Sequence, residues 1–282
     1  MERRGNRIPS GWGWIAPGLL GLGVFYLIPM GRMVMYALQN ESGEWGFGKI
    51  AEVLSNVVFQ LAFRNTMVFV SLAVISITVI SLLISLLVQR MTWYPTVVQS
   101  VLFSPMIIPT ASVMMVFDLF FRYDGVLNTI FRHFGSGPVE FYHSKMALVT
   151  VLLLFLWKNI GYNVIILTAA LENVNRAMYE AASIDGANQI QQFRLITLPS
   201  IRGTLIFVIM ISVLNAFKAF REIYLLLGSY PDQSIYSLQH YMNNLFLVLD
   251  YQKLSVAALT VLIGVLLFVG AMLAIDRKGE GV

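Results

Sequence analysis

Long runs without a charged residue dominate the pattern of apolar and polar positions along this chain. They are longer than the apolar strands of a soluble β-rich protein, and they suit membrane-spanning helices, which need about 20 mostly apolar residues. Two further apolar stretches are interrupted by charges, the first by Lys158 and the second by Lys218, Arg221 and Glu222. The uncharged runs cover residues 8–31, 65–89, 91–117 and 254–275, and the interrupted stretches cover 146–168 and 203–227.

These segments predict an all-α, polytopic membrane protein with six transmembrane helices. The expected spans lie roughly at residues 14–36, 66–88, 97–120, 146–168, 202–226 and 254–275. The first span follows Arg3, Arg4 and Arg7 and superficially resembles a signal peptide, but no small-x-small cleavage site follows it. We therefore expect an uncleaved first helix and a single transmembrane domain over residues 1–282.

The composition agrees with this organisation. Only 12% of the 282 residues are charged and 57% are hydrophobic, whereas soluble domains carry about 25% charged residues. So few charges cannot cover a soluble globule, which excludes a cytosolic enzyme, a disordered chain and a nucleic-acid-binding domain. The sequence has no cysteine, so disulfides, thiolate metal sites and cysteine nucleophiles are excluded as well.

The basic residues of the loops give a small preference for one orientation in the membrane. With the N-terminus inside, nine Lys and Arg residues fall in inner segments and six fall in outer segments. Because basic loops favour the cytoplasmic side, this count leans toward both termini being cytoplasmic. It also places the loop of residues 169–201 on the inner side.

This inner loop predicts two short helices joined by a sharp turn. Asn175 suits the N-cap of a helix that runs through residues 180–182, and Gly186 suits the positive φ of its C-terminal turn. Residues 189–196 predict the second helix, and Pro199 starts the next element. From the residues alone, the pair either rests on the bilayer as an amphipathic hairpin or docks into a protein partner.

The loop also carries three motifs at a characteristic spacing. They are Glu180-Ala181-Ala182, Asp185-Gly186-Ala187 and Leu198-Pro199. In this order, between two predicted spans, they resemble the EAA loop of ABC importer permeases, and the whole chain resembles carbohydrate-importer permeases of the maltose-transporter type. Further matches are Pro105, Pro109, Gly125, Asn128, Trp157, Lys158, Gly161, Phe217, Lys218, Phe220 and Tyr224.

Two positions depart from the family pattern. The family often has a second proline where Gly203 stands, and another proline before the first short helix, where Val174 and Asn175 stand. Both departures concern local rigidity more than the family assignment.

The resemblance implies what the loop does. In this family the loop inserts into a cleft of a cytoplasmic ATPase subunit and carries its ATP-driven closure to the transmembrane helices. Glu180 would contact the ATPase, Gly186 would set the angle between the two short helices, and Leu198 with Pro199 would tie them to the fifth span.

The resemblance also implies the assembly. The partners would be a second permease subunit, two cytoplasmic ATPase subunits and an extracytoplasmic solute-binding protein, in the bacterial cytoplasmic (inner) membrane. This chain would be a transporter subunit and no enzyme. It would hold no cofactor, since ATP and Mg would bind to the partner ATPase.

Charged residues inside the spans draw attention to the transport pathway, because each costs about 2.5–3.5 kcal/mol at the bilayer centre. Asp118 with Arg122, and Lys218 with Glu222, are one helical turn apart and are expected to pair. Lys158 lies near the middle of its span without an acidic neighbour in its own helix. It is therefore expected to face the bundle interior or a wet cavity.

Polar residues near Lys158 and on the fifth span are candidates for a sugar site. A sugar site needs amides and hydroxyls near the membrane midplane, where transporters bind their cargo. By resemblance, the pocket of this permease type is built from these two helices. The alternative is that Ser and Asn hydrogen-bond one helix to the next. The candidates are Lys158, Asn159, Tyr162, Ser212, Asn215 and Ala216.

Two other patterns are set aside. Residues 43–50 nearly match a phosphate-binding P-loop, but Ile50 stands where that motif needs Ser or Thr, so ATP hydrolysis must come from another chain. His133, His143 and His240 lack the spacing of a metal site and are expected at the surface.

We therefore expect the permease subunit of an ATP-driven ABC importer that moves a sugar by alternating access. The alternatives are an ion-coupled secondary transporter, for which inverted repeats are not found, and an intramembrane enzyme, for which no catalytic residues converge. An ABC permease for another solute, such as glycerol phosphate, also stays open. Lys158 could favour an anionic group, but the sequence does not identify the cargo.

Overall fold

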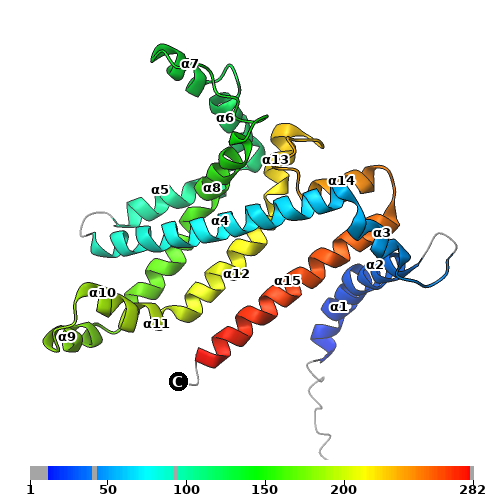
Figure 1. Cartoon of the computed structure of the whole chain (residues 1–282). Coiled ribbons are helices and arrows are strands. Elements are labelled where there is room, and N and C mark those ends of the chain that lie inside the picture. Colours follow the sequence, from blue (N-terminus) through cyan, green and yellow to red (C-terminus); the bar gives the residue numbers. More distant parts are fainter. Residues whose placement is uncertain (1–11, 40–42, 92–94, 280–282) are drawn as a thin grey trace, which may run out of the picture. The chain divides into compact units, whose positions relative to one another are not determined.

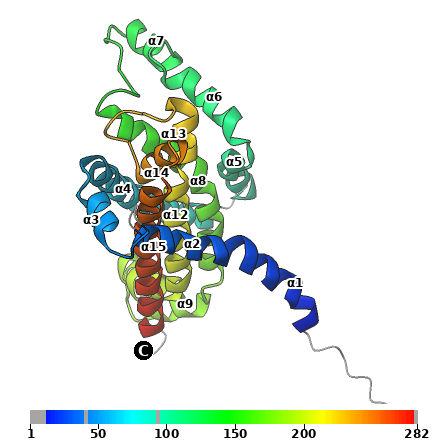
Figure 2. The same ribbon diagram turned by 90° about the vertical axis from the view of Figure 1, so that its right-hand side faces the viewer.

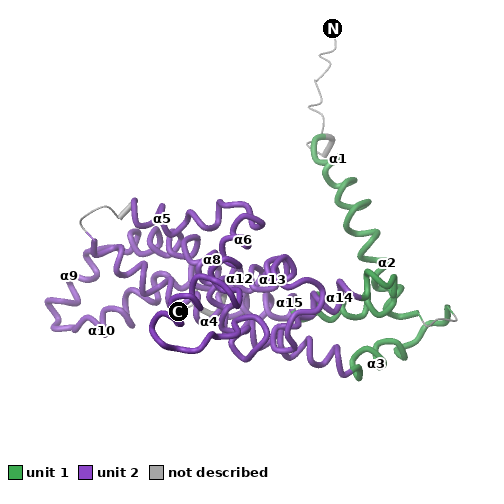
Figure 3. The backbone as a smooth tube through the Cα atoms, turned by 90° about the horizontal axis from the view of Figure 1, so that it is seen from above, with its two compact units in different colours: residues 1–56, 245–264 green, residues 57–244, 265–282 purple. Residues whose placement is uncertain are grey.

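The computed structural model describes residues 12–39, 43–91 and 95–279. Within these ranges the regular structure is helical, apart from one isolated β-bridge between Gln39 and Trp45. This confirms the predicted all-α class. The chain divides into two compact units, residues 1–56 with 245–264 and residues 57–244 with 265–282 (Figure 3).

Five helical segments of the described chain are long and apolar enough to cross a membrane, and a bent pair of helices provides a sixth candidate. This agrees with the predicted number of spans. The five segments are Trp14–Leu38, Val57–Arg90, Met146–Glu172, Arg202–Leu227 and Tyr251–Asp276.

The smaller unit carries the first span and one short helix. Its elements are α1 (Trp12–Leu22), the π-helical turn η1 (Gly23–Leu27), α2 (Ile28–Leu38), α3 (Gly48–Ser55) and the first part of α15 (Tyr251–Gly279). Glu52 of α3 accepts a hydrogen bond from Lys49 at 3.0 Å and pairs with Lys253 at 3.1 Å. These two cations lower the pKa of the exposed Glu52 carboxyl.

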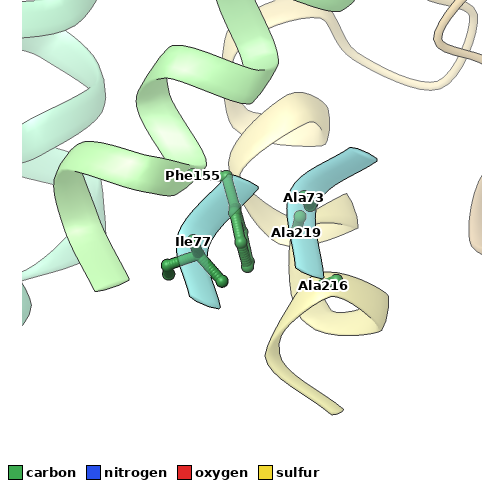
Figure 4. Close-up of a cluster of buried hydrophobic side chains, with 5 residues drawn as sticks. All are labelled: Ala73, Ile77, Phe155, Ala216 and Ala219. Carbon is green, nitrogen blue, oxygen red and sulfur yellow. The ribbon is translucent and has the colours of Figure 1, made fainter. Parts of the chain in front are cut away.

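The larger unit is built around α4 (Val57–Arg90) and α8 (Met146–Glu172), which pack along each other. Helix α8 also packs against α5 (Pro95–Ile107) and α12 (Arg202–Lys218). A buried cluster joins α4, α8 and the end of α12 (Figure 4). Four of its members are small or medium in size, which lets the helix backbones approach closely. The cluster consists of Ala73, Ile77, Phe155, Ala216 and Ala219.

Gly161 shows how close one of these approaches is. A Cβ atom at this position would lie 2.1 Å from the carbonyl oxygen of Leu102 in α5. Only glycine, which lacks that atom, permits this contact between α8 and α5.

The third predicted span is broken. Helix α5 ends at Ile107, α6 (Thr110–Phe121) begins after Pro109, and the two segments are bent by 99° (Figure 1). Proline restricts the residue before it to extended conformations and has no N–H group to continue a helix. The structure therefore differs from the single helix that the apolar run over residues 97–120 predicts.

The two ends of the larger unit carry different short helices. Figures 1 and 2 place α7 (Val126–His133) and α9 (Arg176–Ile184) at opposite ends. The fully buried Asn128 fixes the chain around α7, because its amide donates to the carbonyls of Tyr123 at 3.0 Å and Val139 at 2.8 Å. Its side-chain oxygen accepts from the N–H of Val139 at 2.7 Å.

The fifth span continues into α13 (Phe220–Leu227), and a loop leads from there to α14 (Leu238–Leu247). Helix α4 holds this loop. The Asn65 amide donates to the carbonyls of Gln233 at 2.6 Å and Tyr236 at 3.0 Å, and the Thr66 hydroxyl accepts from the N–H of Leu238 at 2.9 Å.

The expectation of three surface histidines is wrong for His240. Its side chain is 0% exposed, and its Nδ1 atom lies 2.9 Å from the Ser237 hydroxyl. The Phe220 ring meets it edge to face at a centroid distance of 4.7 Å. Burial lowers the pKa of His240 to about 4, so the imidazole is neutral at pH 7. His133 and His143 are exposed, as expected.

Candidate functional site

The inner loop folds as a pair of short helices around a glycine turn. Helix α9 begins after Asn175, whose side chain accepts a hydrogen bond from the N–H of Ala177 at 3.0 Å. It ends before Gly186, which has a φ of +79°. Both predictions from the sequence are therefore confirmed.

The second helix of the pair is continuous but not regular. It comprises α10 (Gln189–Gln192), the π-helical turn η2 (Phe193–Thr197) and α11 (Leu198–Ser200). Asn188 and Gln191 form a capping box at its start, with bonds of 2.9 and 2.8 Å. Pro199 lies near the end of this continuous helix and has no N–H to continue its hydrogen bonds, which agrees with the π-helical turn that precedes it.

Hydrogen bonds join the two helices of the loop to each other. The hydroxyl groups of Tyr179 and Thr197 lie 2.8 Å apart. The side-chain amide of Gln192 donates to the Ser183 hydroxyl at 3.0 Å and to the Ala187 carbonyl at 3.1 Å. The loop is therefore braced on both sides of the turn.

The loop is also anchored to the transmembrane helices. A buried apolar cluster, which we call the loop anchor, packs against Leu82 and Leu86 of α4 and Leu205 of α12. In addition, the Gln89 side chain at the end of α4 donates to the carbonyl of Leu171 at 3.1 Å. The loop anchor consists of Leu171, Val174, Ile196 and Ile201.

The outer side of the loop is open and mixes charge with apolar surface. Ile184 is 87% exposed and Leu195 is 74% exposed. Of the motif residues, Ala182 and Ala187 are half-buried, and the others are exposed. The exposed motif residues are Glu180, Ala181, Asp185, Gly186, Leu198 and Pro199.

A cavity of about 470 Å³ lies in the larger unit, where α8 faces the junction of α12 and α13. Met106 and Thr110, on either side of the break in the third span, also line it. Its polar wall contains both charged and amide side chains. These polar residues are Thr110, Lys158, Asn159, Asn215, Lys218, Arg221, Glu222 and Gln239.

An ion pair between Lys158 and Glu222 forms part of this wall. The Lys158 ammonium also donates to the Thr110 hydroxyl at 2.9 Å. Only 14% of the Lys158 side chain and 15% of the Glu222 side chain are exposed. Through Lys158, Thr110 and Glu222, the helices α8, α6 and α13 meet around one largely buried ion pair.

The expected pairing of Lys218 with Glu222 is wrong. The carboxylate binds Lys158 of the neighbouring helix, because a desolvated ammonium gains more from a counter-charge than an exposed one does. Asp118 and Arg122 are likewise absent from the ion pairs of the described residues. Arg122 lies past the end of α6 in an extended conformation, so the helical spacing that favours such a pair is lost.

The six pathway candidates from the sequence do not all lie together. Lys158, Asn159 and Asn215 line the cavity. Ser212 accepts a hydrogen bond from Asn163 at 2.9 Å between α8 and α12, and Ala216 packs in the cluster of Figure 4. Tyr162 is half-buried and does not line the cavity.

Sequence reasoning missed some of the cavity residues. Thr110 reaches the cavity because the chain bends at Pro109, and Gln239 arrives on α14, a helix not counted among the spans. Arg221 was noted only as a charge within a span. Pro109, next to Thr110, was the available signal for a break, although Pro105 lies within α5 and does not end that helix.

Comparison with known proteins gives one family for most of the chain. The family described as "Binding-protein-dependent transport system inner membrane component" matches residues 77–279. The matched region contains the helix pair at residues 176–200 and the cavity.

Individual relatives are similar over about three quarters of the chain. The lactose transport system permease protein LacF of Rhizobium radiobacter is 28% identical over 223 residues, which cover 76% of this chain and 75% of the relative. The arabinooligosaccharides transport system permease protein AraP of Halalkalibacterium halodurans is 30% identical over 219 residues, covering 74% of this chain and 68% of the relative.

Solved structures show the same fold. A chain of a bacterial ABC transporter involved in the import of the acidic polysaccharide alginate superposes with a TM-score of 0.83 at 22% identity, covering 95% of this chain and 94% of that chain. A second structure, in complex with an alginate pentasaccharide-bound periplasmic protein, gives a TM-score of 0.81 at 21% identity, covering 95% and 93%.

Proposed function

Because the chain belongs to the family of binding-protein-dependent transport system inner membrane components, we propose that it moves a saccharide across the cytoplasmic membrane by alternating access. It is a multi-pass inner-membrane permease of an ABC importer and not itself catalytic. The saccharide is proposed from its relatives, which include permeases for lactose and arabinooligosaccharides.

The braced helix pair at residues 176–200, which we call the coupling loop, is the observation that carries the proposal. Its exposed side offers Glu180, Ile184 and Leu195 to a partner, and its inner side packs through the loop anchor on three membrane helices. A partner that displaces this loop would therefore displace α4, α8 and α12 as well. We propose that the partner is a cytoplasmic ATPase, which holds ATP and Mg, and that both termini lie on the same side as the loop.

The rest of the assembly follows from the importer class. We propose a second permease subunit, two ATPase subunits and an extracytoplasmic solute-binding protein. The similar alginate transporter has been solved with a periplasmic protein that carries its saccharide, which supports the last of these partners.

Charge reversal in the coupling loop tests the proposal. The chain is expressed with its partner subunits as wild type and as Glu180→Lys, and the complexes are purified from the membrane through this chain. We expect Glu180→Lys to lose most of the co-purifying ATPase and the ATP-dependent uptake, with the amount of inserted permease unchanged. A variant that keeps both would contradict the coupling role.

A matched control lies at the opposite end of the unit. Asp124 is 80% exposed beside α7, where it makes a long contact of 3.6 Å with Arg132. Asp124→Lys should retain the ATPase in the purified complex. The same preparations separate an ABC importer from an ion-coupled transporter, since uptake in the latter would persist without ATP when an ion gradient is supplied.

A further inference from the structure

The cavity between α8 and the α12–α13 junction carries more positive than negative charge. Lys158, Lys218 and Arg221 line it, against the single acid Glu222. The ion pair with Lys158 uses the charge of Glu222. Two cationic side chains of the wall are thus left over.

Neither of these two side chains has a partner in the described part of the chain. Among residues 12–39, 43–91 and 95–279, no ion pair or hydrogen bond involves the side chain of Lys218 or Arg221. Lys218 lies 16 residues after Arg202, the first residue of α12, which is about 24 Å along the helix axis. Lys218 and Arg221 both lie within the candidate span Arg202–Leu227, and a cation inside a membrane span needs a compensating group.

The break in the third span adds to the positive potential. Helix α6 begins at Thr110, on the cavity wall, and runs for 12 residues. The N-terminus of a helix carries a partial positive charge, and broken helices of transporters direct such ends toward anionic groups of their cargo. The two cationic side chains and the N-terminus of α6 therefore both favour a ligand with an anionic group.

The remainder of the wall suits a saccharide. Asn215 and Gln239 offer amides that can donate to and accept from hydroxyl groups, and the Asn159 amide keeps its oxygen free while donating to the Phe155 carbonyl at 2.9 Å. Met106 and Leu154 offer apolar surface to the C–H faces of a ring. A volume of about 470 Å³ falls within the range of small-molecule sites.

We propose that this cavity selects a saccharide that carries a carboxylate, a uronic acid or an oligosaccharide that contains one. The guanidinium of Arg221 offers a fork of donors that matches a carboxylate, Lys218 adds a second charge, and the amides bind the hydroxyls. The inference rests on the proposed function, since it names the class of cargo that would pass through the same permease.

Direct binding of matched sugars to the whole complex tests the selection. The purified importer, with its partner subunits and without nucleotide, is titrated at low salt with glucose and glucuronate, galactose and galacturonate, and cellobiose and cellobiouronate. We expect the acidic member of at least one pair to bind about tenfold more tightly than its neutral counterpart, and the preference to fall as salt is raised. Equal binding, tighter binding of the neutral sugars, or no binding of any acidic sugar would overturn the proposal.

Variants of the two free cations connect the preference to this cavity. Arg221→Gln and Lys218→Gln should each reduce the acidic preference severalfold, and Arg221→Lys should keep part of it because the charge remains. Arg132→Gln, at the exposed end of α7, removes a cation outside the cavity and should leave the preference unchanged. A preference that survives in the double variant Lys218→Gln, Arg221→Gln would place the selection elsewhere and overturn the proposal.

Failure of this inference is distinguishable from failure of the proposed function. Every complex is also assayed for co-purifying ATPase. An importer that retains its ATPase but prefers neutral sugars would contradict only the inference. A wild-type complex that contains no co-purifying ATPase would contradict the function.

Discussion

The hydroxyl oxygens of Tyr179 in α9 and Thr197 in η2 lie 2.8 Å apart, across the turn at Gly186. Thr197 is 5% exposed, so this contact is sheltered from water. Together with the bond between Gln192 and Ser183, it makes the coupling loop a braced unit rather than two independent helices. Because its two helices are joined, the coupling loop can move as one rigid unit and pass a displacement on to the membrane helices, whereas a flexible loop would change its own shape instead.

Removal of this brace should weaken coupling more than stability. Tyr179→Phe deletes one hydroxyl and should cost about 1 kcal/mol of unfolding free energy, as typical hydrogen bonds do. We expect more ATP to be hydrolysed per sugar transported, measured in proteoliposomes that contain the whole importer. Tyr230→Phe, which removes a hydroxyl from a side chain that is 78% exposed, is the control and should leave the ratio unchanged.

Substitution of Gly186 should follow backbone preference rather than size. Nothing lies within 4 Å of a Cβ atom at this position, but its φ of +79° is unfavourable for residues with a side chain. Gly186→Ala should cost about 1 kcal/mol, and Gly186→Asn should cost less because asparagine tolerates this region. Assembly with the ATPase, measured by co-purification, should rank wild type, Asn and Ala in that order, and the reverse order of Asn and Ala would contradict this account.

Substitution of Gly161 should act through space alone. The backbone carbonyl of Leu102 would lie 2.1 Å from the new Cβ atom and cannot rotate away as a side chain could. Gly161→Ala should therefore separate α8 from α5 and lower the melting temperature of the purified complex by several degrees or more. Gly264→Ala, in the interior of α15, meets nothing within 4 Å and should melt no lower than the wild type.

The buried pair of Lys158 and Glu222 should show strong coupling in stability. Replacement of one partner leaves an uncompensated charge, so Lys158→Met and Glu222→Gln should each cost about 3–5 kcal/mol. The double variant Lys158→Met, Glu222→Gln should cost clearly less than the sum, as determined from denaturant unfolding of all four proteins in detergent. Additive losses would mean that the two charges do not stabilise each other.

Acid should destabilise the protein through His240. Its folded pKa of about 4 is below the ordinary value of 6.5, so between these values the unfolded state binds a proton that the folded state does not. The contribution of His240 to stability is thus complete above about pH 6.5 and is lost as the pH falls toward 4. From pH 7.5 to pH 5 the loss should be about 2 kcal/mol.

Thermal unfolding as a function of pH measures this effect. His240→Gln is less stable at neutral pH but should lose that part of the acid sensitivity. His133→Gln, on the exposed end of α7, should retain the wild-type pH profile. A His240→Gln protein with an unchanged profile would assign the acid sensitivity to other groups.

Local signals were sufficient for the coupling loop. The cap at Asn175 and the turn at Gly186 depend on residues within a few positions, and the structure has both. The apolar runs likewise predicted the class of fold, because their length alone decides whether a helix can cross a bilayer. Predictions of this kind require no knowledge of the tertiary contacts between helices.

Relationships between distant residues could not be predicted in this way. Glu222 pairs with Lys158, 64 positions away, instead of with Lys218 in the same span. Which lysine is desolvated depends on how the helices pack, and this cannot be read from neighbouring residues. His240 is buried by Phe220 and Tyr236, although it lies in a segment that looks like an outer loop. Thr110 enters the cavity only because of a bend of 99°, whose direction no local pattern specifies.

The first span is subject to a different kind of selection from the central helices. An 18-residue stretch within Trp14–Leu38 has a mean hydropathy of 1.5, and none of its residues is buried in the described chain. Within the compact unit of residues 1–56 and 245–264, such a stretch is restricted mainly by its transfer free energy, apart from the fully buried Ala37. Gly161 has no such freedom, because its site accepts one residue only. Natural sequences should therefore keep glycine at position 161, whereas in the first span Ala37 is the position at which the described chain restricts side-chain size.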